Sequence, residues 1–211
     1  MKVIVFDYDG VLMDTFGLLM NIYKDTSREF NLNLPDDEEY YRELIELDWM
    51  RTLRKLNLTS KEDMEKQNQI FRKGIVKYGE GVSPYPGIWK MLDILSKDHL
   101  LGIATNNIRD EVIPRLEKHN LRKYFKHIFT SEDGKKKPDP DLLIKCLGAF
   151  GAIASDSAYV GDMDGDIACG KAAGIGRMVA VTYGYHRKHR LLDADEIAHS
   201  PEELLEKLTK K

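Results

Sequence analysis

Short apolar runs rich in β-branched residues alternate with helix-length amphipathic segments, and this alternation constrains the fold more than any other feature of the chain. The apolar runs are 3–6, 100–104, 127–129, 158–160 and 178–181, and the helical segments between the later ones are 88–95, 110–119, 140–150 and 167–173. Strands that alternate with helices form right-handed βαβ units with parallel strands. A proline and two glutamates at 201–203 predict one last helix. The sequence therefore predicts an α/β fold with a mainly parallel sheet.

The interval from residue 16 to residue 83 interrupts the alternation. It carries apolar residues at helical spacing, such as Leu18 and Ile22, together with many charges and no clear strand. The turn-forming stretch SPYPG at 83–87 closes it. We therefore predict a helical module inserted after the first strand.

Length, composition and charge exclude several classes of protein. With 211 residues, the chain is long enough for one domain with an insertion or for two small domains. Apolar residues make up 42% of it, which suffices for a packed core and argues against disorder. A nucleic-acid binder is disfavoured because the formal charge is −3.

The chain shows no membrane or export signal. It has no apolar run of the length that a bilayer requires. The apolar run 3–6 is too short for a signal-peptide core. Cys146 and Cys169 lie in apolar helical stretches outside any metal-ligand spacing, and we interpret them as buried residues of a reducing compartment. The expected location is cytoplasmic.

Two aspartates, Asp7 and Asp9, follow the first predicted strand, and Gly10 comes next. Ligands of open α/β sheets bind beyond the carboxyl ends of the strands. Residues two apart on a continuing strand share a face, and two adjacent carboxylates repel unless a cation or a proton separates them. Gly10 lets the backbone turn tightly beside a ligand. The pattern predicts Mg²⁺ binding or a raised pKa, although the aspartates alone could also cap a strand-to-loop turn.

Polar clusters follow two further predicted strands. Thr105 and Asn106 come after the run 100–104 and offer a hydroxyl and an amide to an anion, or cap the next helix. Lys137 ends a run of three lysines before a proline that begins a helix. We interpret the first two lysines as part of a solvated loop.

Three carboxylates, Asp162, Asp164 and Asp166, follow the run 158–160. A calcium loop is one alternative, but the glycine and the glutamate of the EF-hand pattern do not fall in place. Asp164 is interpreted as a loop residue or a helix cap. Because four polar clusters stand at the ends of four predicted strands, we expect one composite site.

The stretches FDYDGVLMDT, ATNN, GKKKPDPD and VGDMDGDIACGKAAG, in this order and spacing, resemble the haloacid dehalogenase-like hydrolase superfamily. Within it, the chain resembles the phosphoglycolate phosphatase and β-phosphoglucomutase-like branch, whose helical cap follows the first motif. The resemblance covers the whole chain, including PYPG at the end of the insertion. It implies a Rossmann-like core of residues 1–15 and 86–211 with an inserted all-helical cap of residues 16–85.

The resemblance also implies roles for residues of the first two motifs. Asp7 is expected to be the nucleophile that forms an aspartyl-phosphate. Asp9 is expected to protonate the leaving group and then to activate water. Thr105, with Asn106 beside it, would bind the phosphoryl oxygens, and Gly10 would lie against the substrate.

Mg²⁺ is the cofactor that the resemblance implies. Asp7, the backbone carbonyl of Asp9 and Asp162 would hold it, with Asp166 as a further or water-mediated ligand. Lys137 would neutralise phosphate charge and keep Asp7 ionised, since a nearby cation lowers the pKa of a carboxyl group.

The function implied is a Mg²⁺-dependent phosphatase acting on a small phosphorylated metabolite through an aspartyl-phosphate. Dehalogenation is disfavoured because dehalogenases lack an acid at the position of Asp9. One alternative is a phosphomutase of the β-phosphoglucomutase type, which passes the phosphoryl group to a sugar hydroxyl. Another is a non-enzymatic phospho-acceptor regulator, although every catalytic position is filled. The sequence leaves monomer and homodimer open.

The insertion offers candidate residues for substrate specificity. Arg51 and Arg54 could hold a carboxylate or a second phosphate, although arginines three apart are also typical of a solvated helix face. Trp49 is interpreted as part of the cap core. The basic segment 183–190 is interpreted as a solvated loop.

Overall fold

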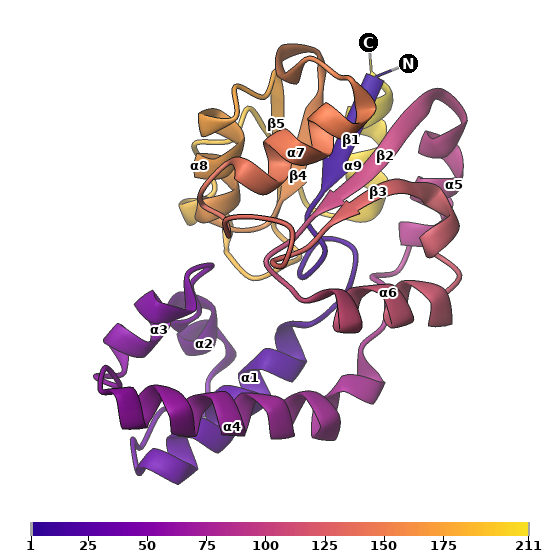
Figure 1. Cartoon of the computed structure of the whole chain (residues 1–211). Coiled ribbons are helices and arrows are strands. Elements are labelled where there is room, and N and C mark those ends of the chain that lie inside the picture. The colour runs from indigo at the N-terminus through magenta and orange to yellow at the C-terminus, as the bar shows by residue number, and fades with distance from the viewer. Residues whose placement is uncertain (1, 211) are drawn as a thin grey trace.

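A parallel sheet forms the centre of the computed structural model, which describes residues 2–210 (Figure 1). Its strands are β1 (Lys2–Phe6), β2 (His99–Ala104), β3 (Phe125–Phe129), β4 (Ala158–Gly161), β5 (Arg177–Val181) and β6 (Glu196–Ala198). They lie in the order β3-β2-β1-β4-β5-β6, and all neighbouring pairs are parallel. The predicted α/β fold with a parallel sheet is confirmed.

Helices cover both faces of the sheet. One face carries α5 (Ile88–Asp98), α6 (Arg109–Lys118) and α9 (Pro201–Thr209), and the other carries α7 (Asp141–Phe150) and α8 (Asp164–Ala172). Ile4 and Phe6 of β1 pack with the first layer, and Val3 and Val5 pack with the second. This division follows because successive side chains of a strand point to opposite faces. The result is the three-layered, Rossmann-like core that the resemblance implied.

The helices between β1 and α5 form the all-helical cap. They are α1 (Phe16–Phe30), α2 (Glu38–Leu44), α3 (Trp49–Lys55) and α4 (Lys61–Tyr78), and Figure 1 shows them beyond one end of the sheet. A capping box of Ser60 and Asp63 begins α4. A buried hydrogen bond of 2.9 Å from Thr26 to Gln67 joins α1 to α4. The cap therefore has polar as well as apolar packing of its own.

Short 3-10 turns connect several elements. They are η1 (Gly79–Gly81), η2 (Arg122–Tyr124), η3 (Ala154–Asp156) and η4 (Lys188–Arg190). The first returns the chain from the cap to the core, and the last lies in the segment 183–190.

Two elements differ from the sequence-based expectation. The edge strand β6 was not predicted, because its three residues are too few for an apolar run. Helix α8 begins at Asp164 rather than at residue 167, so Asp164 and Asp166 lie in its first turn. Both cysteines are free and buried, as expected. None of the helices in residues 2–210 is long and apolar enough to span a membrane.

Candidate active site

The carboxyl ends of β1, β2 and β4 meet at one edge, because β1 pairs in parallel with both neighbours. Asp7 directly follows β1, Thr105 follows β2 and Asp162 follows β4. All three side chains are buried. The cap lies beyond this end of the sheet in Figure 1. Residues that lie far apart in the sequence are thus neighbours at the predicted place.

Lys137 reaches this edge from the loop between β3 and α7, and its side chain is completely buried. Its Nζ lies 2.8 Å from Asp7 Oδ1, 2.7 Å from Asp166 Oδ1 and 3.0 Å from the Tyr159 hydroxyl. An ammonium group has three N–H donors, so these three acceptors use all of them. Burial by itself would lower the pKa of Lys137, but Asp166 and Asp7 raise it above its usual value. The lysine is therefore a fixed cation between two carboxylates.

Three carboxylates, Asp7, Asp162 and Asp166, surround a common point, since one oxygen of each lies within 4.8 Å of the others. Burial raises the pKa of Asp7 from 3.8 to about 7, although Lys137 opposes the shift. Burial, together with the charges of Asp166 and Asp7, also raises the pKa of Asp162. A cation at this point would remove the cost of ionising the cluster.

The hydrogen bonds of Asp162 indicate where such a cation fits. Its Oδ2 accepts a hydrogen bond of 2.6 Å from the Tyr185 N–H. Its Oδ1 is buried and has no hydrogen-bond partner among residues 2–210. A buried carboxylate oxygen without a donor is costly, and oxygen ligands of this kind suit Mg²⁺. The side chains present therefore fit the implied cofactor.

Asp166 has both carboxylate oxygens occupied. Oδ1 accepts from Lys137 and, at 2.8 Å, from the Tyr159 hydroxyl, while Oδ2 accepts from the N–H groups of Asp162 and Met163 at 3.3 and 3.1 Å. Asp166 is thus better suited to contact a cation through water than directly. Of the two roles expected for it, direct ligand and water-mediated ligand, these hydrogen bonds favour the second. Tyr159 was not identified from the sequence, because its apolar context resembles that of any buried strand residue.

Asp9 lies beside Asn107, a residue to which the motifs assigned no role. The Asn107 amide donates a hydrogen bond of 3.0 Å to Asp9 Oδ2. Burial raises the pKa of Asp9, and hydrogen bonds from Thr15 and Asn107 only partly offset this. A carboxyl group with a raised pKa suits a general acid. The hydroxyl of Thr105 accepts from the Asn107 N–H at 3.1 Å and keeps its own proton free to donate.

Asn106 has a different partner from the one expected. Its Oδ1 accepts from the Lys137 N–H at 2.7 Å, and its Nδ2 donates to the Lys137 carbonyl at 2.9 Å. Because both ends of the amide are used, Asn106 holds the lysine loop in place. Because Nδ2 carries a second N–H donor, the predicted contact of this side chain with substrate does not require these bonds to break.

Gly10 is at a position that only glycine fits. Its φ is +74°, and a Cβ there would lie 2.1 Å from Asp162 Oδ2. The tight turn after the two aspartates is thus as expected, and its cause is the close approach of the Asp162 carboxylate.

Arg51 and Arg54 are not part of this cluster. Both side chains are more than half exposed, and both lie near Asp48 of their own segment, at 4.0 and 3.6 Å. Trp49 packs against the apolar cluster of the cap, as expected. The contacts of Arg51 and Arg54 match the solvated helix face considered as an alternative.

The segment 183–190 is not the solvated loop expected from its charge. His186 is fully buried, and its Nε2 donates to the Ile45 carbonyl at 3.1 Å. Arg190 pairs with Glu46 of the cap at 2.8 Å and with Asp164 at 2.6 Å. The sequence could not reveal this, because the acidic partners are far away in the chain.

Glu46, Asp164 and His186 form a second group with metal-ligating side chains. The Asp164 N–H donates to His186 Nδ1 at 3.2 Å, so both ring nitrogens of the histidine are occupied. Arg190 pairs with both carboxylates, and Lys55 lies 2.6 Å from Glu46, so two cations already accompany the two acids. The contacts of this group join cap and core.

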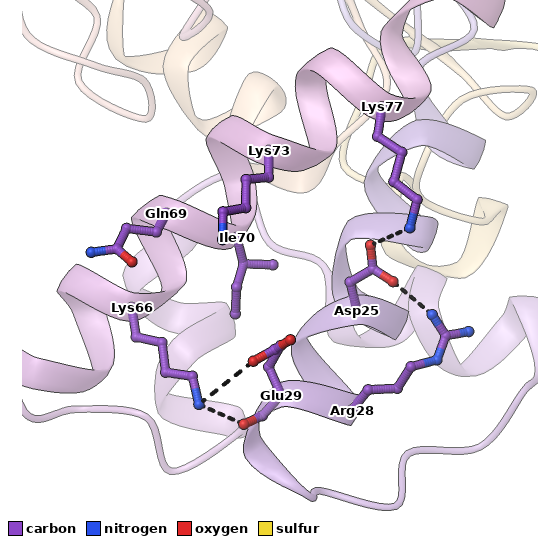
Figure 2. Close-up of a pocket in the computed structure, with 8 residues that line it drawn as sticks. All are labelled: Asp25, Arg28, Glu29, Lys66, Gln69, Ile70, Lys73 and Lys77. Carbon is purple, nitrogen blue, oxygen red and sulfur yellow. Dashed lines mark hydrogen bonds and ion pairs between the residues drawn. The ribbon is translucent and has the colours of Figure 1, made fainter.

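Two surface hollows lie elsewhere. One, of about 260 Å³, lies between α1 and α4, and Figure 2 shows that Asp25 and Glu29 pair there with Lys77, Arg28 and Lys66. The other, of about 460 Å³, lies where the chain crosses between cap and core. Neither is lined by Asp7, Asp9, Thr105 or Lys137. The charges in Figure 2 largely satisfy one another.

Comparison with known proteins agrees with this arrangement. A profile of the family described as haloacid dehalogenase-like hydrolase matches residues 4–181. A phosphorylated carbohydrates phosphatase from Thermotoga maritima is 27% identical over 97% of both chains. A phosphoglycolate phosphatase from Aquifex aeolicus is 32% identical over 88% of this chain and 86% of its own. A solved structure of a haloacid dehalogenase-like family hydrolase from Streptococcus pneumoniae has a TM-score of 0.85 at 23% identity and covers 99% of both chains.

Proposed function

Because the chain belongs to the haloacid dehalogenase-like hydrolase family, we propose that it is a Mg²⁺-dependent phosphatase that hydrolyses a small phosphate monoester through an aspartyl-phosphate. The observation that carries the proposal is the pairing of a buried Lys137 with Asp7, beside an Asp162 oxygen that has no hydrogen-bond partner within the described range. Together these groups supply a nucleophile, a fixed positive charge and a carboxylate oxygen that is available to bind a cation.

Asp7 is the nucleophile in this proposal. Its Oδ1 is held by Lys137 and by the Tyr8 N–H at 2.7 Å, and Oδ2 has no hydrogen bond within residues 2–210. Oδ2 is therefore free to attack phosphorus, with the phosphorus–leaving-group bond breaking as the phosphorus–carboxylate bond forms. Lys137 favours the ionised form of Asp7, because its positive charge opposes the effect of burial on the pKa of this carboxyl group.

Asp9 is the acid and base. It protonates the leaving-group oxygen, and the resulting carboxylate then takes a proton from the water that hydrolyses the aspartyl-phosphate. Asn107 donates to one Asp9 oxygen and so helps to hold the side chain that transfers the proton. Thr105 donates its hydroxyl proton to a phosphoryl oxygen.

Asp7, Asp162 and the backbone carbonyl of Asp9 would hold Mg²⁺, with Asp166 behind them. When bound, the ion neutralises the carboxylates and the phosphoryl oxygens as their charge develops. With the bounds expected from the sequence, residues 16–85 form the cap that encloses the substrate. Relatives named for phosphoglycolate and for phosphorylated carbohydrates support a small, hydroxylated or carboxylated leaving group.

The test is phosphate release from a panel of phosphoglycolate, sugar phosphates, nucleoside monophosphates, pyrophosphate and p-nitrophenyl phosphate, with Mg²⁺ and with EDTA. We expect turnover that requires Mg²⁺ and favours one ester, and none with Asp7→Asn, whose amide is a poor nucleophile. Multiple turnovers by Asp7→Asn would refute the nucleophile assignment. Isomerisation of a sugar phosphate without net release would favour the phosphomutase instead.

A further inference from the structure

The residues that follow β5, 183–190, lie between the core and the cap, and we call them the docking loop. Arg187 pairs with Glu39 of α2, with Nε and Oε1 3.0 Å apart, and His189 lies 3.0 Å from Glu43. The cap thus meets the docking loop mainly through one helix, α2, and the residues that follow it.

Arg42 of α2 is buried in this contact, and its side chain is only 9% exposed. Its Nη1 donates to the Gly184 carbonyl and, at 3.2 Å, to the Tyr185 carbonyl. Within the cap, Glu38 binds its Nη2 at 2.6 Å, and the Phe16 ring lies 3.9 Å below the guanidinium. The arginine is therefore fixed by the cap and holds two backbone carbonyls of the core.

The same two residues of the docking loop contact the candidate metal ligand on their other side. The Tyr185 N–H donates to Asp162 Oδ2 at 2.6 Å, and the His186 N–H donates to the Asp162 carbonyl at 3.3 Å. A Cβ on Gly184 would lie 2.4 Å from Asp162 Oδ2, so this glycine packs directly on the carboxylate. These contacts hold Oδ2, and Oδ1 is the Asp162 oxygen that has no hydrogen-bond partner among residues 2–210.

The aromatic ring of Tyr185 adds a second link to the cap. It packs edge-on against Phe16, with 5.6 Å between the ring centroids, and its hydroxyl lies 3.0 Å from the Thr15 hydroxyl at the start of α1. The cap thus holds the docking loop at two carbonyls and at this ring, while two backbone N–H groups of the loop bind Asp162.

We propose that Arg42 is a positioning residue that couples docking of the cap to binding of Mg²⁺, by fixing the Gly184–Tyr185 turn that orients Asp162. The inference rests on the proposed function only in taking Asp162 as a Mg²⁺ ligand. When the cap leaves, the two carbonyls lose their donor, and the turn no longer fixes Asp162. Coupling between two binding equilibria is reciprocal. If docking of the cap raises the affinity for Mg²⁺ by a given factor, Mg²⁺ must therefore raise the ratio of docked to open cap by the same factor.

The test is direct titration of Mg²⁺ by calorimetry, without substrate, into the wild type, Arg42→Met and Arg42→Lys. Residues that orient a metal ligand change metal affinity by about tenfold to hundredfold when they are replaced, and we expect a loss in this range for Arg42→Met. Arg42→Lys restores one donor, so its affinity should lie in between. Arg28→Met is the matched control, because Arg28 also pairs with an acid of its own helix, Asp25.

A second readout follows the cap itself. Dyes on cysteines introduced at Gln69 and Lys126, two exposed positions on α4 and β3, report the cap–core distance by energy transfer. We expect Mg²⁺ to shorten this distance in the wild type and in Arg28→Met, and to shorten it less in Arg42→Met. If Arg42→Met does not fold, Glu38→Gln replaces it, because Glu38 is an exposed residue that holds Arg42.

The outcomes separate this inference from the proposed function. A wild type that binds Mg²⁺, together with a folded Arg42→Met that binds it equally well, overturns the coupling and leaves the phosphatase proposal intact. A wild type that binds no Mg²⁺ overturns both.

Discussion

At the scale of single residues, the site depends on charges that burial would make unfavourable in isolation. Lys137 has no exposed surface, and its ammonium group contacts two buried carboxylates. Each member of such a cluster is stable only because the others are present. This interdependence makes the site sensitive to the loss of one charge.

Lys137→Met tests this dependence. It leaves Asp7 and Asp166 buried without their cation, and breaking a buried pair in this way costs about 3–5 kcal/mol. We expect the free energy of unfolding to fall by this amount in urea titrations, and turnover to be lost as well. Lys145→Met, which breaks the exposed pair with Asp141, should change stability much less. A Lys137→Met protein as stable as the wild type would show that the carboxylates are protonated.

Mg²⁺ should stabilise the protein more at high pH than at low pH. In the metal-free protein the pKa of Asp7 is raised from 3.8 to about 7. A carboxyl group whose pKa is higher in the folded state stabilises the fold below its unfolded pKa, and this contribution is lost as the pH rises through 7. Mg²⁺ binds the ionised carboxylates and so offsets the loss of stability that their ionisation causes at high pH. At low pH, protons compete with Mg²⁺ for the same carboxylates.

Thermal melts at pH 5.5 and pH 8, with and without Mg²⁺, check this expectation. Free Mg²⁺ at about 100 times its Kd contributes about 2.7 kcal/mol, or about 5–10 °C in Tm for a domain of this size. We expect this increase at pH 8 and a smaller one at pH 5.5. Asp162→Asn should abolish the effect, and equal increases at both pH values would contradict the raised pKa.

At the scale of elements, the turn after β1 requires glycine at position 10. Gly10→Ala places a methyl group where the Asp162 carboxylate lies, at a φ of +74°. We expect a loss of more than about 1 kcal/mol in the free energy of unfolding, together with weaker Mg²⁺ binding. Gly17→Ala is the control, because a Cβ there meets nothing within 4 Å and lies in helix α1. Equal stability of Gly10→Ala and the wild type would show that the turn can relax.

Elements with a local signal could be predicted from the sequence. The buried runs of β1, β2, β4 and β5 and the amphipathic helices α5 and α7 determine their own structure, since periodicity within each segment matches its burial. The same signal placed Asp7, Thr105 and Asp162 at strand ends. Strand β6 gave no such signal, because it is short and depends on pairing with β5.

Features that depend on distant partners could not be predicted. Arg187, His189 and Arg190 resemble a solvated patch in the sequence. In the fold, α2 and the residues that follow it bring Glu39, Glu43 and Glu46 beside them. Asn106 and Asn107 are adjacent in sequence, yet one binds the Lys137 backbone and the other binds Asp9. Two neighbouring residues of the same type have different partners here, and only the folded structure shows which role each one has.

At the scale of the whole molecule, two kinds of contact join the cap to the core. The apolar cluster of the cap includes Met163 and Tyr185 of the core. Around it lie ion pairs between α2 and the docking loop. Apolar contacts are not weakened by electrostatic screening, whereas exposed ion pairs are screened beyond about 10 Å at 0.1 M salt and beyond about 3 Å at 1 M. The balance between docked and open cap should therefore respond to ionic strength.

The pair of Arg187 and Glu39 tests this balance. An exposed pair contributes about 0.2–1 kcal/mol, so Arg187→Gln should lower the ratio of docked to open cap by up to about fivefold. Glu39→Gln should do the same. Arg187 also lies 3.5 Å from Glu38, and Glu39 also lies 3.9 Å from Arg42. The double variant should therefore lower the ratio further than each single variant, but by less than the sum of their effects, because the Arg187–Glu39 pair is lost only once. Raising NaCl to 1 M should lower the ratio in the wild type and have less effect in the double variant. The energy-transfer pair on α4 and β3 measures the ratio.

Lys24→Gln is the control for these variants, because Lys24 pairs with Asp36 inside the cap. Additive effects of the two single changes would show that Arg187 and Glu39 act on the cap independently, and the docking contact would then have to lie with the buried residues Arg42 and His186.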